Sequence, residues 1–228
     1  MKTLRIALCR GTIFNETVAL LEGVGLDLSE VCNNTRKLIF ETADGTRFIT
    51  TRPTDVPTYV EYGAADVGFV GKDVLLEARR NVYEVLDLGI GRCRLVFATP
   101  EGHDRSLDAL RHLGTFRVAT KYPSITRDYF QARGINPDII TLHGSIELAP
   151  LVGLADGIVD LTSTGTTMRE NRLEERFQLY DFTTRMIVNR VSHKMLAPQV
   201  SELVARLRGL IGAGTGAEGG SRTAGAGS

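Results

Sequence analysis

Short apolar runs alternate with amphipathic stretches along most of the chain, and the same order of elements occurs twice. In the first half, an apolar run at 4–8 predicts a strand, and a helix is expected over about 15–22. In the second half, a strand is expected over 116–119 and a helix over about 126–133. Short apolar strands that alternate with glycine-terminated helices are typical of βα units on a parallel sheet that is buried on both faces.

Each half then continues with a second, matching strand. The sequence Gly-x-Ala-Asp occupies 63–66 in the first half and 153–156 in the second, and apolar strands are expected after it, over 67–70 and 157–161. A glycine turn and a further helix follow in both halves. The repeat predicts two α/β lobes that share one plan, and the alternative is a chance similarity between βα units.

The first half also contains a predicted β-hairpin, in which the runs LIFET and RFITT flank an Asp44-Gly45 turn. Loops that follow parallel strands lie at the carboxyl ends of those strands, where open α/β sheets bind ligands. We therefore expect a ligand cleft between the two lobes, lined by four loops at 9–12, 71–73, 120–124 and 162–167.

The predicted domain limits follow from the same repeat. Lobe I takes residues 1–92, with 178–211 returning to it, and lobe II takes residues 93–177. From Gly212 onward the sequence is rich in glycine and alanine and holds no large apolar residue. Such a segment cannot offset the entropy cost of being ordered, so residues 212–228 are expected to be a disordered tail.

Charge and composition exclude several classes of function. The 27 basic residues balance the 27 acidic ones and the pI is near 6.9, so no overall field favours a nucleic-acid backbone or an anionic membrane. The three cysteines are widely spaced, and we find neither a secretory signal nor an apolar run of about 20 residues. We expect a cytoplasmic protein without a disulfide framework or zinc site, in which an anionic ligand meets a local basic cluster.

The segment after the last short apolar strand carries the most specific chemistry. Residues 162–167 are too polar to continue inside a sheet, and Thr167 and Glu170 have the spacing of a helix capping box. Free N–H groups of a first helical turn, together with the hydroxyls, would form a neutral pocket for a phosphate dianion, and Gly165 permits a positive φ beside it. The Asp160 carboxylate can accept hydrogen bonds from two ribose hydroxyls. A ribose 5-phosphate is the indicated ligand, and an ordinary capped helix is the alternative.

The same segment resembles a known family signature. Glu147, Asp160-Leu161, Thr164-Gly165 and Thr167-Met168 are similar to the pattern of ATP phosphoribosyltransferase, the enzyme that begins histidine biosynthesis. Further similar stretches, spread over about 4–208, are RKLIF at 36–40, Arg52 with DVP at 55–57, GAADVGFVGKD at 63–73, ATKYP at 119–123 and GSIELAP at 144–150.

The resemblance implies a two-lobed fold of the type II periplasmic-binding-protein class. It also implies a glycosyl transfer that joins N1 of ATP to phosphoribosyl pyrophosphate, giving N1-(5-phospho-β-D-ribosyl)-ATP and pyrophosphate. The chain is similar to the short form of the family, which lacks a C-terminal regulatory domain. A histidyl-tRNA-synthetase-like regulatory subunit, a homodimer within a hetero-oligomer, and Mg²⁺ bound mainly through substrate phosphates are therefore implied.

The resemblance further implies roles for individual residues. Glu147 and Asp160 would orient the donor's ribose, and its 5′-phosphate would be bound by Thr162, Ser163, Thr164, Gly165, Thr166 and Thr167. Arg36 and Arg10 are the expected catalytic residues, because guanidinium groups suit the several oxygens of a departing pyrophosphate. The expected ATP-binding residues are Arg10, Gly11, Arg36, Arg52, Asp66, Gly68, Gly71, Lys72 and Asp73.

One position departs from the family pattern, and some alternatives stay open. The family commonly has Lys-Gly-Arg where this chain has Arg10-Gly11-Thr12, so the first loop lacks a second positive charge. Asp73 could be only the N-cap of its helix. The histidines are scattered, and no metal site on the protein is expected. The competing functions are a non-catalytic binding module of the same architecture and a phosphoribosyltransferase for another base.

Overall fold

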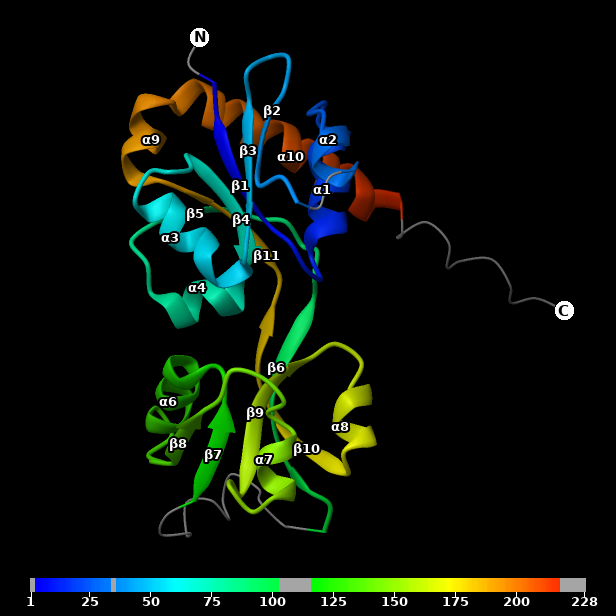
Figure 1. Cartoon of the computed structure of the whole chain (residues 1–228), viewed down its shortest axis with the longest axis vertical. Coiled ribbons are helices and arrows are strands. Elements are labelled where there is room, and N and C mark those ends of the chain that lie inside the picture. The colour runs from blue at the N-terminus through cyan, green and yellow to red at the C-terminus, as the bar shows by residue number, and fades with distance from the viewer. Residues whose placement is uncertain (1–2, 34–35, 103–115, 218–228) are drawn as a thin grey trace, which may run out of the picture. The chain divides into compact units, whose positions relative to one another are not determined.

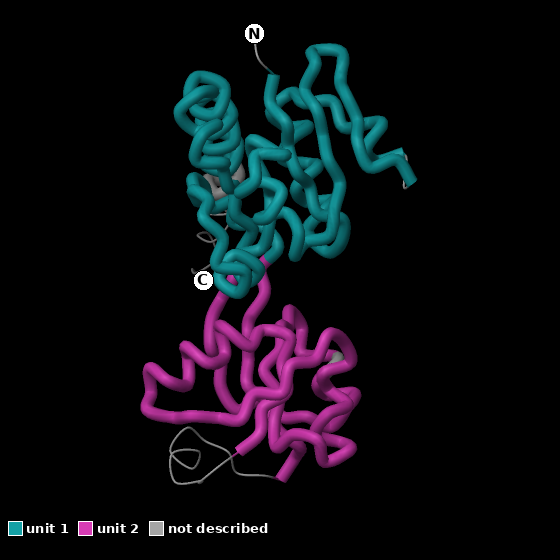
Figure 2. The backbone as a smooth tube through the Cα atoms, turned by 60° about the vertical axis from the view of Figure 1, so that its left-hand side comes forward, with its two compact units in different colours: residues 1–91, 183–228 teal, residues 92–182 magenta. Residues whose placement is uncertain are grey.

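The computed structural model describes residues 3–33, 36–102 and 116–217, and the chain divides into two compact α/β units. Unit 1 comprises residues 1–91 and 183–228, and unit 2 comprises residues 92–182 (Figure 1, Figure 2). The chain therefore leaves unit 1 after Gly91 and returns to it after Phe182, whereas the sequence placed the return at residue 178.

Unit 1 is built on a six-stranded mixed sheet with the strand order β2-β3-β1-β4-β11-β5 (Figure 1). The strands are β1 (Arg5–Cys9), β2 (Ile39–Glu41), β3 (Arg47–Thr51), β4 (Val67–Gly71), β5 (Tyr83–Asp87) and β11 (Thr184–Val188). The central strand β1 runs parallel to β3 and β4, whereas β2, β11 and β5 are antiparallel to their neighbours. The carboxyl ends of β1, β3 and β4 therefore lie at one edge of the sheet, where β2 begins.

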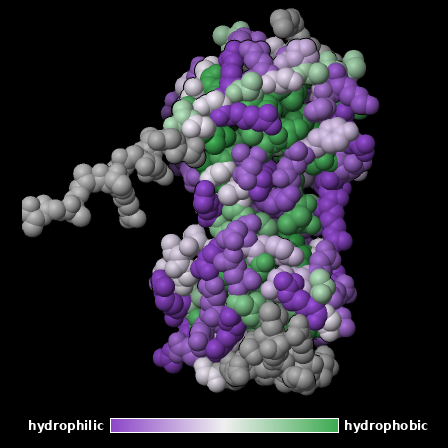
Figure 3. All heavy atoms as spheres, turned by 180° about the vertical axis from the view of Figure 1, so that it is seen from behind, coloured by the Kyte–Doolittle hydropathy of each residue, from purple (hydrophilic) through white to green (hydrophobic). Residues whose placement is uncertain are grey.

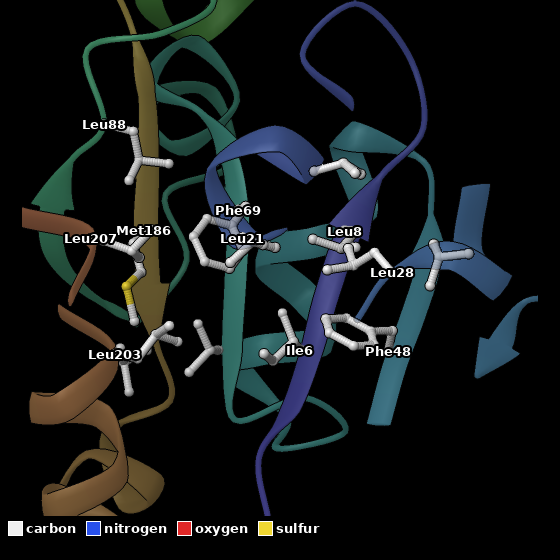
Figure 4. Close-up of a cluster of buried hydrophobic side chains, with 14 of the residues drawn as sticks. Ile6, Leu8, Leu21, Leu28, Phe48, Phe69, Leu88, Met186, Leu203 and Leu207 are labelled. Atoms are coloured by element: carbon white, nitrogen blue, oxygen red, sulfur yellow. The ribbon is translucent and has the colours of Figure 1, made fainter. Parts of the chain in front are cut away.

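Side chains alternate across β1, so different helices cover the two faces of the sheet. Ile6 and Leu8 pack in a core cluster with α1 (Phe14–Gly23) and α10 (Ala197–Ala217), as Figure 4 shows. Ala7 and Cys9 pack on the opposite face with α3 (Val56–Glu61) and α4 (Lys72–Ala78). The remaining helical segments of the unit are α2 (Ser29–Asn33), the 3-10 turn η1 (Pro53–Asp55) and α9 (Arg190–Met195).

Unit 2 has a five-stranded mixed sheet with the strand order β10-β6-β9-β7-β8 (Figure 1). The strands are β6 (Cys93–Pro100), β7 (Arg117–Thr120), β8 (Asp138–Thr141), β9 (Gly157–Thr162) and β10 (Leu173–Phe182). Strand β7 runs parallel to β8 and β9, and β6 runs antiparallel to β9 and β10. The carboxyl ends of β7 and β9 are therefore neighbours at one edge.

Helices cover both faces of this second sheet as well. On one face, Val118 and Val159 pack in a cluster with Phe130 of α6 (Pro123–Gln131). On the other face, Ala119 and Ile158 pack with residues of α7 (Leu148–Leu151) and α8 (Thr166–Glu170). Because Asp160 is two residues beyond Ile158 on the same strand, its side chain is on the α7 and α8 side of the sheet.

The predicted alternation of strands and helices is confirmed, but the expectation of parallel sheets was wrong. Each sheet keeps parallel strands at its centre and adds antiparallel strands beside them. Strands β6 and β11 follow the two crossings between units and start at the carboxyl edge of their sheets, so they run against the central strands. The predicted hairpin is confirmed, because β2 and β3 are antiparallel and Gly45 in their turn has a φ of +82°.

The last helix extends further than the sequence indicated. Helix α10 continues past Gly212, where the tail was expected to begin, to Ala217. Residues 218–228 of the predicted tail lie outside the described residues.

The surface carries both polar and apolar groups. Hydrophilic residues cover much of the face drawn in Figure 3, and hydrophobic residues gather in a patch on unit 1. Within the described ranges, no helix combines the length and the apolar character needed to cross a membrane.

Candidate functional site

The parallel register of β7 and β9 brings two charged side chains together at the carboxyl edge of unit 2. The paired residues extend to Thr120, which lies opposite Val159. The following residues are adjacent too, and Lys121 Nζ lies 3.3 Å from Asp160 Oδ1. The Lys121 side chain is 41% exposed and that of Asp160 is 19% exposed. Lys121 lies in a stretch that supports the family resemblance, but no role was predicted for it from the sequence.

Asp160 lies in surroundings that oppose its charge. Burial raises the pKa of Asp160, and the nearby Glu147 carboxylate raises it further. Lys121 and the Leu161 N–H lower this pKa, but burial outweighs them, so the pKa stays above its ordinary value. The Leu161 N–H donates to Oδ1 at 2.8 Å. No hydrogen bond from the described part of the chain reaches Asp160 Oδ2. This oxygen can accept a hydrogen bond from a ligand hydroxyl.

The loop between β9 and α8 is held by its own hydroxyl groups. Thr162 Oγ1 accepts a hydrogen bond from the Gly165 N–H at 2.8 Å, and Thr164 Oγ1 accepts one from the Thr166 N–H at 3.4 Å. Gly165 has a φ of +72°, the positive value expected from the sequence, which glycine adopts without strain. An anion that binds these two amides must therefore replace the hydroxyl oxygens as their acceptor.

A cavity of about 190 Å³ lies beside this loop in unit 2. It is lined by Glu147, Ile158, Asp160, Leu161, Thr162, Ser163, Thr164, Thr166 and Met168. Six of the predicted donor-binding residues therefore meet at one cavity, namely Glu147, Asp160, Thr162, Ser163, Thr164 and Thr166. Its lining combines carboxylates and hydroxyl groups with apolar side chains, which is a suitable surface for a sugar with a phosphate group.

One expectation about the loop was wrong, and one charged neighbour of the loop was not predicted. Helix α8 begins at Thr166, and the Arg169 N–H donates to Gly165 O at 3.1 Å, so Thr167 lies inside the helix and is not its N-cap. The loop is also not surrounded by neutral groups alone, because Arg169 Nη2 donates to Thr164 O at 3.2 Å. Arg169 comes one helical turn after Gly165, and this spacing could have identified it in the sequence.

In unit 1, the four predicted cations lie at the carboxyl edge of the sheet. Arg10 follows β1, Arg52 follows β3, and Lys72 begins α4 directly after β4. Arg36 precedes the antiparallel strand β2, which begins at the same edge. Arg36 and Arg52 are both exposed. The sheet topology thus gathers along one edge positive charges that are far apart in the sequence.

Arg10 is held more closely than the exposed arginines. Its backbone N–H donates to Thr51 O at 3.1 Å, and its Nη2 donates to Val31 O at 3.2 Å. Its guanidinium carbon lies 5.2 Å from the centre of the Phe14 ring. Gly11 follows with a φ of +138°, a conformation that favours glycine. The loop therefore holds the Arg10 side chain against α1 and α2.

The turn after β4 brings Gly71 and Asp73 into contact. Asp73 is buried in the first turn of α4, and a Cβ at Gly71 would stand 2.2 Å from Asp73 Oδ1. Glycine at this position therefore permits the placement of Asp73. Helix α4 begins at Lys72 with Gly71 as its N-cap, so the alternative of Asp73 as the N-cap is wrong. Lys72 is ion-paired with Glu84 of β5.

Asp66 and Gly68 do not belong to this edge. Asp66 precedes β4 at the opposite edge of the sheet, where it accepts hydrogen bonds from Arg5 Nη2 at 2.8 Å and from Ser192 Oγ at 2.6 Å. Burial raises the pKa of Asp66, but the bonds from Arg5 and Ser192 outweigh burial and hold it below its ordinary value. A Cβ at Gly68 would stand 2.7 Å from Val60 Cγ2, so this glycine lets α3 pack on β4. Neither residue is brought to the candidate site.

Histidine and cysteine side chains are the remaining groups that can bind metals or act as nucleophiles. No group of His, Cys, Asp and Glu side chains in those ranges is arranged to hold a metal ion. Cys9 precedes the first loop, but burial raises its pKa to about 12 and so disfavours the reactive thiolate. His103 and His112 lie outside the described residues.

Comparison with known proteins adds an independent observation. The family model described as ATP phosphoribosyltransferase (HisG) matches residues 52–209, which is more than half of the chain. The chain belongs to the ATP phosphoribosyltransferase family. ATP phosphoribosyltransferases of Geobacter metallireducens and Sorangium cellulosum are both 49% identical to it, over 90% and 91% of this chain and 96% and 95% of their own lengths. The family and the enzyme class expected from the sequence are confirmed.

Solved structures agree with this family and with the predicted fold class. A chain of the ATP phosphoribosyl transferase (HisG:HisZ) complex from Thermotoga maritima is 34% identical with a TM-score of 0.77, covering 92% of this chain and 98% of that chain. The periplasmic aliphatic sulphonate binding protein SsuA from Escherichia coli is 12% identical with a TM-score of 0.55, covering 91% and 69%. The second likeness is one of fold alone, and it confirms the expected periplasmic-binding-protein class.

Proposed function

We propose that the chain is the catalytic subunit that joins N1 of ATP to the ribose C1 of phosphoribosyl pyrophosphate. The products are N1-(5-phospho-β-D-ribosyl)-ATP and pyrophosphate, in the first step of histidine biosynthesis. The observation that carries this proposal is the cavity in unit 2 at which Asp160 and Glu147 meet the hydroxyl-rich loop. Carboxylates for ribose hydroxyls and hydroxyls for a phosphate are the two kinds of group that a phosphoribosyl donor requires.

In this proposal, unit 2 binds the donor. Asp160 and Glu147 accept hydrogen bonds from the ribose hydroxyls, and Thr162, Ser163, Thr164 and Thr166 donate to the 5′-phosphate. The amides of the loop, with Gly165 and Thr167, complete the phosphate site. Arg169 supplies positive charge beside the loop, since its Nη2 lies 3.4 Å from Thr166 Oγ1.

Unit 1 binds ATP and stabilises the leaving pyrophosphate. Arg36 and Arg10 are the catalytic groups, because negative charge develops on pyrophosphate as its bond to C1 breaks. Arg52, Lys72 and Asp73 lie at the same edge of the sheet, and Gly11 and Gly71 shape its loops. Adenine N1 is a neutral nucleophile, so positioning contributes more than a strong base would. Thr12 stands where the family commonly has arginine, which leaves more of the leaving-group charge to Arg10 and Arg36.

Mg²⁺ enters the reaction with the phosphates of the substrates. This ion keeps most of its waters and binds phosphate oxygens with few protein ligands. When bound, the ion would neutralise part of the polyphosphate charge. The arginines of unit 1 would stabilise the negative charge that remains.

The proposed enzyme works with a separate regulatory subunit of the HisZ type. Support comes from the Thermotoga maritima complex, since its HisG-like chain is 98% covered by this sequence. A homodimer within that hetero-oligomer and a cytoplasmic location remain predictions.

The direct test is to mix the purified chain with ATP, phosphoribosyl pyrophosphate and Mg²⁺, with and without a HisZ-type subunit. We expect adduct absorbance and released pyrophosphate in equal amounts. An Asp160→Asn variant should raise the apparent KM for the donor about tenfold, because it removes a charged acceptor for ribose hydroxyls. If neither product forms in either mixture, the enzyme proposal fails and a non-catalytic binding module remains.

A further inference from the structure

Lys121 lies beside the donor cavity, and the proposed reaction does not yet include it. Its Nζ lies 3.3 Å from Asp160 Oδ1, and the Tyr122 ring centre is 5.3 Å from the same ammonium group. Lys121 is not among the residues that line the cavity, whereas Asp160 is. The lysine and the Leu161 N–H both contact Oδ1 of Asp160, so Asp160 Oδ2 can accept a hydrogen bond from a ligand.

The surroundings of Asp160 explain why a cation is needed there. Val96 of β6 is its partner in the sheet, and Ile158 and Met168 line the same cavity, so much of the environment is apolar. Glu147 adds a second carboxylate to the small cavity. Burial and a like charge both favour the neutral acid, whereas the ionised carboxylate is the form that acts only as a hydrogen-bond acceptor, at both oxygens.

The other cations on elements next to β9 are engaged elsewhere. Arg94 of β6 donates to both carboxylate oxygens of Glu175, at 2.6 Å and 3.1 Å. Arg169 of α8 donates to Thr164 O. Within the described ranges, Lys121 is the cation that pairs with Asp160.

We propose that Lys121 is a positioning residue for the phosphoribosyl donor, and that it keeps Asp160 ionised and oriented to accept the ribose hydroxyls. The inference rests on the proposed function, because it requires the donor to bind at Asp160. Lys121 acts through Asp160 and does not touch the reacting atoms. The raised pKa of Asp160, which burial causes and Lys121 counteracts, agrees with this role.

The same pair of strands offers a matched control at its other end. Arg117 begins β7, and its Nε lies 3.6 Å from Oδ2 of Asp156, which immediately precedes β9. Lys121→Met and Arg117→Met each remove a cation that pairs with an aspartate of the adjacent strand segment. Only the partner of Lys121 lines the donor cavity. Effects that both variants share therefore report on the sheet, and effects confined to Lys121→Met report on the donor site.

The experiment is steady-state kinetics across about pH 5–9 on the full chain assembled with its regulatory subunit. Lys121→Met should move the acidic limb of kcat/KM for the donor to higher pH, because Asp160 then gains its proton at a higher pH. At the acidic end, the donor KM should rise roughly tenfold, while the KM for ATP stays unchanged. Lys121→Arg should restore most of the loss, and Arg117→Met should leave the acidic limb in place. An unmoved limb in Lys121→Met would overturn the inference.

A double-mutant cycle separates action through Asp160 from direct contact with the donor. In an Asp160→Asn background, Lys121→Met should add no further rise in donor KM. A further rise would mean that the lysine binds the donor itself, which overturns the positioning role but leaves the donor site intact. If Asp160→Asn alone leaves the donor KM unchanged, the proposed donor site fails, and the role of Lys121 fails with it.

Discussion

Asp66 and Asp156 occupy equivalent places in the two units. Asp66 accepts the backbone N–H of Arg5 at 2.9 Å, and Asp156 accepts the backbone N–H of Arg117 at 2.7 Å. In return, the backbone N–H of each aspartate donates to the carbonyl of the same arginine, at 2.8 Å and 2.9 Å. Each Gly-x-Ala-Asp sequence therefore joins the amino ends of two parallel strands, and its aspartate supports the fold.

Asp66→Asn should lower the free energy of unfolding by about 2 kcal/mol at neutral pH, since the buried carboxylate accepts charged hydrogen bonds. Although burial raises the pKa of Asp66, the bonds from Arg5 and Ser192 hold it below its ordinary value. Its contribution is therefore complete above the ordinary aspartate pKa and is lost as the pH falls toward the folded-state pKa. Urea denaturation at neutral and acidic pH should show the variant and the wild type converging in acid.

Asp156→Asn is the matched control for this prediction. The Asp156 side chain is 32% exposed against 4% for Asp66, so its replacement should lower the urea midpoint less. If Asp66→Asn left the stability unaltered and raised the KM for ATP, the structural role would be contradicted. Asp66 would then be a nucleotide-binding residue.

The repeat was visible in the sequence, but the roles of its members were not. Hydrophobic alternation and the two Gly-x-Ala-Asp sequences identified the matching strands of both units. Asp66 was assigned to ATP from the family resemblance, although it precedes the predicted strand over 67–70 and so belongs to the edge opposite the ligand loops. Asp156 occupies the equivalent place in the second repeat and was given no ligand role. Comparing the two aspartates could have corrected the assignment of Asp66.

Contacts that depend on strand register and helix placement could not be predicted from the sequence. Lys121 and Asp160 are far apart along the chain, and only the parallel pairing of β7 with β9 makes them neighbours. Gly68 was expected near a ligand, but a Cβ there would strike Val60 of α3. By contrast, the positive φ of Gly165 could be predicted, because a polar turn between a strand and a helix requires a permissive residue.

Replacing Gly165 with alanine should weaken donor binding beyond its effect on stability. Gly165 and Gly153 both have a φ of +72°, so alanine at either position should cost about 1 kcal/mol in backbone strain. A Cβ at Gly153 would meet nothing within 4 Å, and at Gly165 the nearest atom is Arg169 Nη1 at 3.8 Å. Only Gly165→Ala should also raise the donor KM, by about tenfold, because the strained backbone would shift an amide of the phosphate loop away from its acceptor. Equal donor KM values for both variants would contradict this placement of the phosphate.

The Thr162 hydroxyl should matter for the donor because it both lines the cavity and accepts the Gly165 N–H at 2.8 Å. Thr162→Val keeps the shape of the side chain and removes the hydroxyl, so we expect a donor KM about tenfold higher. Thr162→Ser should retain near wild-type kinetics. Thr126→Val is a suitable control, since the buried Thr126 hydroxyl has no hydrogen-bond partner among the described residues. A similar change in donor KM for both valine variants would count against a specific role of Thr162.

Arg36 should affect turnover more than substrate affinity. It is exposed at the carboxyl edge of the unit 1 sheet, and a guanidinium group that meets the leaving pyrophosphate acts mainly in the transition state. Arg36→Ala should therefore lower kcat on the order of 10²-fold with a smaller change in KM. Arg47→Ala is the control, because Arg47 starts β3 at the opposite edge and its Nη2 pairs with Glu41 at 3.0 Å. The effect is measured as the steady-state rate with both substrates saturating. An unchanged kcat in Arg36→Ala would mean that Arg10 or the metal ion, and not Arg36, stabilises the charge on the leaving pyrophosphate.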